Sequence, residues 1–263
     1  MERPRIVTTS WDDGDRLDLR LAEILRARQI RGTFYIPLTP YLGRPPLTHN
    51  ELRGLSAEGF EIGAHGVSHK HLWKLSPAEL AKEINPCKPT LEDILGTEVR
   101  MFCYPRGRYD ANVVRALKEA GYRGARTVRL LATHPEFDPF EMPTTVQAVP
   151  HRRFSYFKNV ARAQELEGWH VFLAEIANLG NWVELGKKLF DSVLENGGIW
   201  HLWGHSWEIE EMGLWKDLEE MLDYVCNREG VRYISNGDLI PALCARTAEQ
   251  TNGIGAYESN YRS

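Results

Sequence analysis

The 263-residue sequence lacks a long apolar run, a positive net charge and a local basic patch. A bilayer-spanning helix needs about 20 consecutive apolar residues, and no stretch approaches that length. The 32 Lys and Arg residues are outnumbered by 36 Asp and Glu residues, so the formal net charge is −4. We therefore expect no membrane span and no nucleic-acid partner. The strand-like start directly after the first residues predicts no signal peptide.

Cysteine is scarce, and no two of the four cysteines form a CxxC pair, which excludes a zinc knuckle and a dense disulfide framework. The four residues are Cys87, Cys103, Cys226 and Cys244. Isolated cysteines are typical of a reducing compartment, so we expect a cytoplasmic protein. The sequence also lacks the GxGxxG, P-loop and GxSxG patterns, which argues against dinucleotide binding, nucleotide hydrolysis and a serine-hydrolase site.

Strand-like runs alternate with amphipathic helical stretches, and 43% of the residues are hydrophobic, as in a globular domain. The predicted strands are 5–9, 32–36, 60–63, 99–103, 122–125, 198–203 and 231–235. This alternation predicts one α/β domain, either a barrel or a doubly wound sheet, over residues 1–246. Residues 247–263 are polar and predicted to be a tail. Nothing in the sequence indicates an oligomeric state.

Helices are predicted from apolar spacing and from capping signals. Capping boxes begin at Thr48 and Ser76, and Pro86 and Pro89 predict a break in the second of these helices. Asp15 is expected to cap a helix that starts near Arg16. The other predicted helices are 17–28, 110–120, 153–166, 182–195 and 210–228, and residues 133–150 are predicted to be a long loop.

Polar residues gather just after four of the predicted strands. The four segments are 11–15, 65–69, 104–107 and 205–208. Because the carboxyl ends of parallel strands lie on one face of a barrel or sheet, these segments are expected to form one site.

Two histidines and a carboxylate in these segments predict a metal site. His65 and His69 are four residues apart and can direct ring nitrogens at one ion. Asp12 and Asp13 are adjacent, so on an extended segment one can bind a cation while the other stays free beside it. Two histidines and one carboxylate leave coordination positions open, which is typical of a catalytic site. The same donor set occurs in non-haem iron oxygenases, which gives an alternative reading.

The order and spacing of four motifs resemble those of the polysaccharide deacetylases of the NodB-homology type, carbohydrate esterase family 4. The motifs are residues 9–14 (Thr-Ser-Trp-Asp-Asp-Gly), the histidine pair, residues 104–107 (Tyr-Pro-Arg-Gly) and residues 197–205. The resemblance implies a single-domain distorted (β/α) barrel of about seven strands. It also implies a divalent metal, usually zinc but also cobalt, nickel, iron or manganese, and removal of an N-acyl group from an amino sugar or glycan precursor.

The resemblance also implies roles for individual residues. Asp12 corresponds to the catalytic base, and the metal ligands correspond to Asp13, His65 and His69. The main-chain N–H of Arg106, in the motif that also holds Tyr104 and Pro105, corresponds to the oxyanion donor. The general acid is a histidine of the last motif, either His201 or His205. The position beyond the strand end favours His205, whose pKa Glu208 could raise.

The sequence departs from the family pattern at two places. Cys103 stands where the family has an arginine that holds the catalytic aspartate, and Arg100, Arg106 and Arg108 are the candidates to replace it. No Asp-Trp fourth motif is recognisable, and Asn181-Trp182 and Asp138 are poor matches. Trp11, Trp203 and Trp207 lie beside motif residues, where they could pack in the core or stack on a sugar. A deformylase, another hydrolase of non-peptide C–N bonds and a non-catalytic sugar-binding relative remain alternatives.

Overall fold

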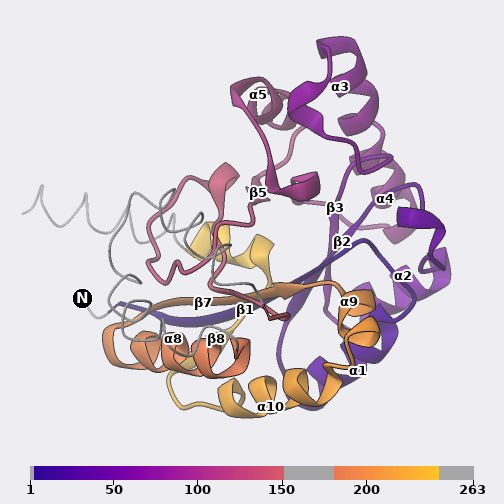
Figure 1. Ribbon diagram of the computed structural model, residues 1–263. Helices are drawn as coiled ribbons and strands as arrows, with labels where there is room; N and C mark the ends of the chain where they lie inside the picture. Colours follow the sequence, from indigo (N-terminus) through magenta and orange to yellow (C-terminus); the bar gives the residue numbers. More distant parts are fainter. Residues whose placement is uncertain (1–2, 151–180, 243–263) are drawn as a thin grey trace, which may run out of the picture.

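A computed structural model describes residues 3–150 and 181–242, which are coloured in Figure 1. They form one curved sheet in which every strand pair is parallel, with the order β5-β4-β3-β2-β1-β7-β6 and with β8 paired to β1. The strands are β1 (Arg5–Asp12), β2 (Gly32–Ile36), β3 (Glu61–Ala64), β4 (Met101–Cys103), β5 (Gly124–Arg126), β6 (Val146–Gln147), β7 (Gly198–Gly204) and β8 (Val231–Tyr233). The fold is a (β/α) half-barrel, which confirms the predicted class.

Helices lie on the outer side of this sheet (Figure 1). They are α1 (Asp18–Ala27), α2 (His49–Ala57), α3 (Pro77–Ile84), α4 (Cys87–Leu95), α5 (Ala111–Glu119), α8 (Trp182–Asn196), α9 (Ser206–Glu211) and α10 (Trp215–Val225). The described residues also contain the short 3₁₀ turns η1 (Tyr41–Gly43), η2 (Leu72–Lys74), η3 (Pro105–Gly107) and η4 (Pro139–Glu141). None of the described helices is long and apolar enough to cross a membrane. The predicted helix at 153–166 and the predicted tail lie outside the described residues.

Local sequence signals explain most helix boundaries. Thr48 and Ser76 both form complete capping boxes, with Glu51 and Glu79 respectively, at the starts of α2 and α3. Pro86 ends the α3 stretch because it has no N–H to donate, and the chain starts again as α4. The predicted break is therefore confirmed.

Three local predictions are wrong. The single helix predicted at 210–228 is two helices, since Gly213 takes a left-handed conformation (φ 68°) between α9 and α10. Asp15 does not cap α1, which begins at Asp18; its carboxylate accepts from the Leu17 amide at 2.9 Å in the preceding turn. The predicted loop at 133–150 contains the two-residue strand β6, which is too short to give a periodic pattern.

Alternate residues of the strands contribute side chains to two separate apolar cores. Val7, Phe34 and Phe102 belong to the core between the sheet and the helices. Ile6 and Tyr35, with Met101 and Cys103 of β4, belong to a smaller core on the other side of the sheet, inside the half-barrel. Side chains alternate along a strand, so Thr8, Ser10 and Asp12 of β1 share the inner side with Ile6. The inner side thus changes from apolar to polar toward the carboxyl end of β1.

Candidate active site

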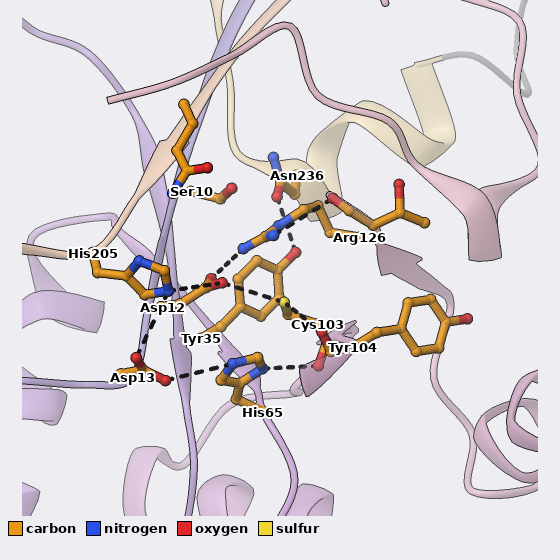
Figure 2. A network of polar contacts seen from close by, with 12 residues as sticks. Ser10, Asp12, Asp13, Tyr35, His65, Cys103, Tyr104, Arg126, His205 and Asn236 are labelled. Atoms are coloured by element: carbon orange, nitrogen blue, oxygen red, sulfur yellow. Dashed lines mark hydrogen bonds and ion pairs between the residues drawn. The ribbon is translucent and has the colours of Figure 1, made fainter. Parts of the chain in front are cut away.

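The polar segments that follow β1, β3 and β7 meet at one edge of the sheet (Figure 2). Asp12 is the last residue of β1, and Asp13 follows it with a left-handed backbone (φ 78°). His65 follows β3, and His205 follows β7. The parallel registers of β1 with β2 and β7, and of β2 with β3, bring these ends together.

Asp13, His65 and His69 form a compact set of possible metal ligands. The Asp13 Oδ1 atom lies 3.6 Å from His65 Nε2 and 3.5 Å from His69 Nε2. Asp13 Oδ1 and His65 Nε2 are buried and have no hydrogen-bond partner among the described residues. Buried polar atoms left without partners are costly unless a ligand satisfies them, so this donor set fits a divalent cation.

Neighbouring groups orient these ligands. The Nδ1 of His65 lies 2.9 Å from the Cys103 carbonyl oxygen, so the proton belongs on Nδ1 and the Nε2 lone pair is free. Trp207 Nε1 donates to Asp13 Oδ2 at 3.0 Å, which leaves Oδ1 directed at the two histidines. Burial lowers the pKa of both His65 and His69 to about 4, so both are neutral at pH 7, as ligation requires.

A second possible set, Asp12 with His65 and Cys103, is less suited to a metal. Asp12 already carries a buried ion pair with Arg126. Burial also raises the pKa of the Cys103 thiol well above its usual value, and a thiol must lose its proton to bind a metal. The first set is therefore the metal site that the geometry favours.

Asp12 is held by a residue that sequence analysis missed. The Arg126 guanidinium at the end of β5 donates to Asp12 Oδ1, and both side chains are buried (Figure 2). The guanidinium also lies 4.8 Å from the Trp203 ring centroid. Burial raises the pKa of Asp12, but the charges of Arg126, His65 and His205 outweigh it and bring the pKa to about 2.

None of the three arginines considered from the sequence contacts Asp12. Arg100 pairs with Glu61 and Asp238, and both Arg106 and Arg108 are exposed. The alternation of inward and outward side chains along β5 could have identified Arg126. Ala125 packs in the outer core, so Arg126 faces inward, and a charged side chain at an inward position needs a partner.

His205 faces the two aspartates. Its Nε2 lies 3.7 Å from Asp13 Oδ2 and 4.0 Å from Asp12 Oδ2. Its Nδ1 lies 2.6 Å from Glu208 Oε2, on the first turn of α9. Burial lowers the pKa of His205, but the hydrogen bond and charge of Glu208 together with Asp12 and Asp13 raise it above its usual value.

His201 lies inside the half-barrel, away from the metal ligands. Its Nε2 bonds with the Ser10 hydroxyl at 2.8 Å and its Nδ1 with the Pro143 carbonyl at 3.0 Å. Burial lowers its pKa to about 3, so it is neutral. The two poor matches for a fourth motif are helix caps: Asn181 caps α8 and Asp138 caps η4.

The third motif contributes backbone rather than side chains. The Tyr104 ring stacks on Tyr109 at 4.3 Å and its hydroxyl donates to the Phe140 carbonyl, so it points away from the metal set. Pro105 is buried, and Arg106 has a left-handed backbone (φ 59°). No described hydrogen bond occupies the Arg106 amide, which leaves that N–H available to a substrate oxygen.

Two of the three tryptophans beside the motifs are packing residues. Trp11 is buried under the helices, with its Nε1 bonded to Thr9. Trp203 is also buried and lies against Arg126. Trp207 is half-buried beside Asp13, and Arg44 lies 4.9 Å from its ring centroid.

A curved parallel sheet with these residues at its carboxyl ends is the architecture of the NodB-type (β/α) barrels, and comparisons with known proteins agree. Residues 2–125 match the family model described as polysaccharide deacetylase. A segment is 27% identical over 123 residues to the putative polysaccharide deacetylase YheN of Bacillus subtilis, covering 45% of this chain and 42% of the relative. The match therefore spans less than half of that relative.

Solved structures extend the likeness to most of the described fold. A putative polysaccharide deacetylase from Mycobacterium smegmatis aligns with a TM-score of 0.63 and 16% identity, covering 94% of this chain and 92% of that one. The chitin deacetylase of Colletotrichum lindemuthianum aligns with a TM-score of 0.61 and 17% identity, covering 90% and 88%. These matches confirm the fold, and the family-model match over residues 2–125 confirms the resemblance to polysaccharide deacetylases that the motifs predict.

Proposed function

We propose that this protein is a metal-dependent hydrolase that removes an N-acyl group, in the first instance acetyl, from an amino sugar or glycan precursor. The position of Asp12 carries the proposal. Its carboxylate is ionised and is fixed by the ion pair with Arg126. It lies beside the donor set of Asp13, His65 and His69, and its Oδ2 lies 4.0 Å from His205 Nε2. A base, an open metal site and an acid within one buried edge are the groups that amide hydrolysis requires.

The donor set Asp13, His65 and His69 would hold the cation, and we propose zinc. When bound, such a cation supplies a lowered pKa for water and polarisation of the acyl carbonyl. Asp12 takes the proton from the attacking water. As the carbonyl carbon becomes tetrahedral, the Arg106 amide donates a hydrogen bond to the oxyanion.

The C–N bond then breaks. His205, protonated and held by Glu208, gives its proton to the departing nitrogen, so the products are the carboxylic acid and the free amine. His201 cannot do this, because Ser10 and Pro143 occupy its two ring nitrogens inside the half-barrel. His205 is therefore the proposed acid, and Glu208 its positioning residue.

The proposal is tested by acyl release from N-acetylated and N-formylated amino sugars with zinc-loaded protein. The Asp12→Asn variant is expected to lose activity at least about 100-fold, the usual contribution of a positioned base. Asp15→Asn is the matched control, since this nearby carboxylate pairs with Arg44 and bonds the Leu17 amide instead. Equal turnover in wild type and Asp12→Asn would remove Asp12 from the mechanism. Formate in place of acetate would assign a deformylase.

Metal content separates the alternatives. About one divalent ion per chain, lost in a His65→Ala/His69→Ala variant, is expected by elemental mass spectrometry. Iron together with oxygen consumption would favour the oxygenase reading, and sugar binding without acyl release would favour the non-catalytic relative. Cys87, Cys103 and Cys226 are free thiols, which suits a reducing compartment, and we propose the cytoplasm.

A further inference from the structure

Two cations beside an exposed tryptophan lie on the segments that follow His69 and the Arg106 amide, and they take no part in the proposed chemistry. Trp73 and Lys74 lie in η2, which begins three residues after His69, and Arg108 directly follows η3. Trp73 is 39% exposed, which is high for a tryptophan. We call Trp73, Lys74 and Arg108 the Trp73 rim.

The Trp73 ring holds the two cations together. Lys74 Nζ lies 5.2 Å from the ring centroid and the Arg108 guanidinium carbon lies 5.9 Å from it. Cation–π contact of this kind positions flexible side chains before any ligand arrives, which reduces the entropy cost of binding. The sequence shows no basic patch because these residues come from separate loops, after β3 and after β4.

These cations have no acidic partner within the part of the chain that the structure describes. Other cations near the site are neutralised: Arg44 pairs with Asp15 and Glu211, and Lys70 pairs with Glu83. The described residues make no ion pair with Lys74, Arg106 or Arg108, although acidic residues outnumber basic ones in the chain. The acid nearest Arg108 in sequence, Asp110, accepts two amide hydrogen bonds as the N-cap of α5.

The Trp73 rim is continuous in sequence with His69 and with the proposed oxyanion donor, because η2 begins three residues after His69 and Arg108 lies two residues after Arg106. Pro105 Cγ lies 3.6 Å from the position that a Cβ on Gly66 would take, so the loops after β3 and β4 are in contact. The two rim cations therefore lie on the same two loops that hold His69 and the Arg106 amide.

We propose that Lys74 and Arg108, organised by Trp73, bind a negatively charged group attached to the acylated sugar, either a phosphate ester or a carboxylate. The proposal rests on the proposed function, because it assumes that an acylated sugar occupies the metal set. A chain with net charge −4 otherwise repels anions, so cations left unpaired beside the site select for charge on the substrate.

Binding is measured by titration calorimetry on the zinc-loaded Asp12→Asn protein, which avoids turnover. The probes are methyl N-acetylglucosaminide, N-acetylglucosamine 1-phosphate and N-acetylglucosaminuronic acid. At low salt at least one anionic probe is expected to bind about tenfold more tightly than the neutral probe, and the difference should shrink at high salt. Phosphate preference assigns a phosphate ester and uronate preference a carboxylate. Equal affinities for all three probes overturn the proposal.

A metal ion can itself attract anions, so variants locate the effect. Lys74→Gln/Arg108→Gln is expected to remove most of the anionic preference and to leave affinity for the neutral probe unchanged. Lys216→Gln/Arg232→Gln removes the same charge from exposed positions on α10 and β8 and is expected to keep the preference. A preference that survives in the rim variant, or disappears equally in the control, overturns the proposal. Acetate release from the neutral sugar by wild type reports the proposed function separately, so each can fail alone.

Discussion

Replacing Arg126 tests whether the buried ion pair with Asp12 supports the fold. Arg126→Met keeps a long apolar side chain beside Trp203 and removes the charge. Arg126 is completely buried and Asp12 is 3% exposed, so the carboxylate would lose its partner where water cannot replace it. The free energy of unfolding at pH 7 is expected to fall by about 3–5 kcal/mol, the usual cost of breaking a buried pair.

The stability difference between wild type and Arg126→Met should depend on pH. In wild type the pKa of Asp12 is about 2, below the ordinary 3.8, so its contribution is about 2 kcal/mol, complete above about pH 4 and lost as the pH falls through 2. Without Arg126, burial is opposed less and the folded-state pKa of Asp12 rises. The stability gap between wild type and variant should therefore be largest at pH 7 and narrow toward pH 4.

Urea unfolding of the metal-free protein, followed by tryptophan fluorescence, measures both quantities. The control is Arg123→Met, which breaks an Arg–Glu98 pair whose side chains are 60% and 46% exposed and is expected to cost less than about 1 kcal/mol. Arg126→Lys should fall between wild type and Arg126→Met, because it keeps the charge and loses the planar geometry. A cost for Arg126→Met no larger than the control, or a gap that does not change with pH, would refute the reasoning.

Three further predictions concern other parts of the molecule. Glu208→Gln removes the charge that holds His205, so kcat for acyl release should fall at least about tenfold with little change in KM; a change confined to KM would contradict the positioning role. The pKa of buried His201 is about 3 against an ordinary 6.5, so its contribution to stability is complete above about pH 6.5 and falls by about 2 kcal/mol by pH 5. Between pH 7 and pH 5 the unfolding free energy of His201→Gln, measured by urea titration, should fall by about 2 kcal/mol less than that of wild type. An equal fall in both proteins would contradict the role given to His201. Gln29 follows α1 with a left-handed backbone (φ 55°), so Gln29→Gly should raise the unfolding free energy by about 1 kcal/mol without changing activity.

The sequence predicts that Asp13, His65 and His69 lie together because each of them lies in a short segment directly after a strand. Asp13 follows β1, and His65 and His69 follow β3, so the positions of strand ends suffice to bring them together. Most helix boundaries follow from local signals in the same way, as the capping boxes at Thr48 and Ser76 illustrate.

The missed features depend on the curvature of the sheet. Arg126 contacts Asp12 although β5 and β1 are separated by three strands. Local sequence patterns do not predict a contact between strands that are not neighbours. The hydrogen bond from Trp207 to Asp13 requires α9 to turn back over the end of β1. The Trp73 rim joins two loops that pack only after the sheet forms. In each case the partners are set by tertiary packing rather than by propensity.

The Arg126–Asp12 pair links two strands that share no backbone hydrogen bonds, across the hollow side of the half-barrel. The proposed base is therefore held in place by a side chain whose backbone belongs to β5, at the opposite part of the sheet. Flattening or opening the sheet would pull Arg126 away from Asp12 before the proposed metal ligands separate. Loss of activity on heating should consequently report the opening of the half-barrel, and substitutions in β3 or β4 that alter its curvature would act on catalysis from a distance.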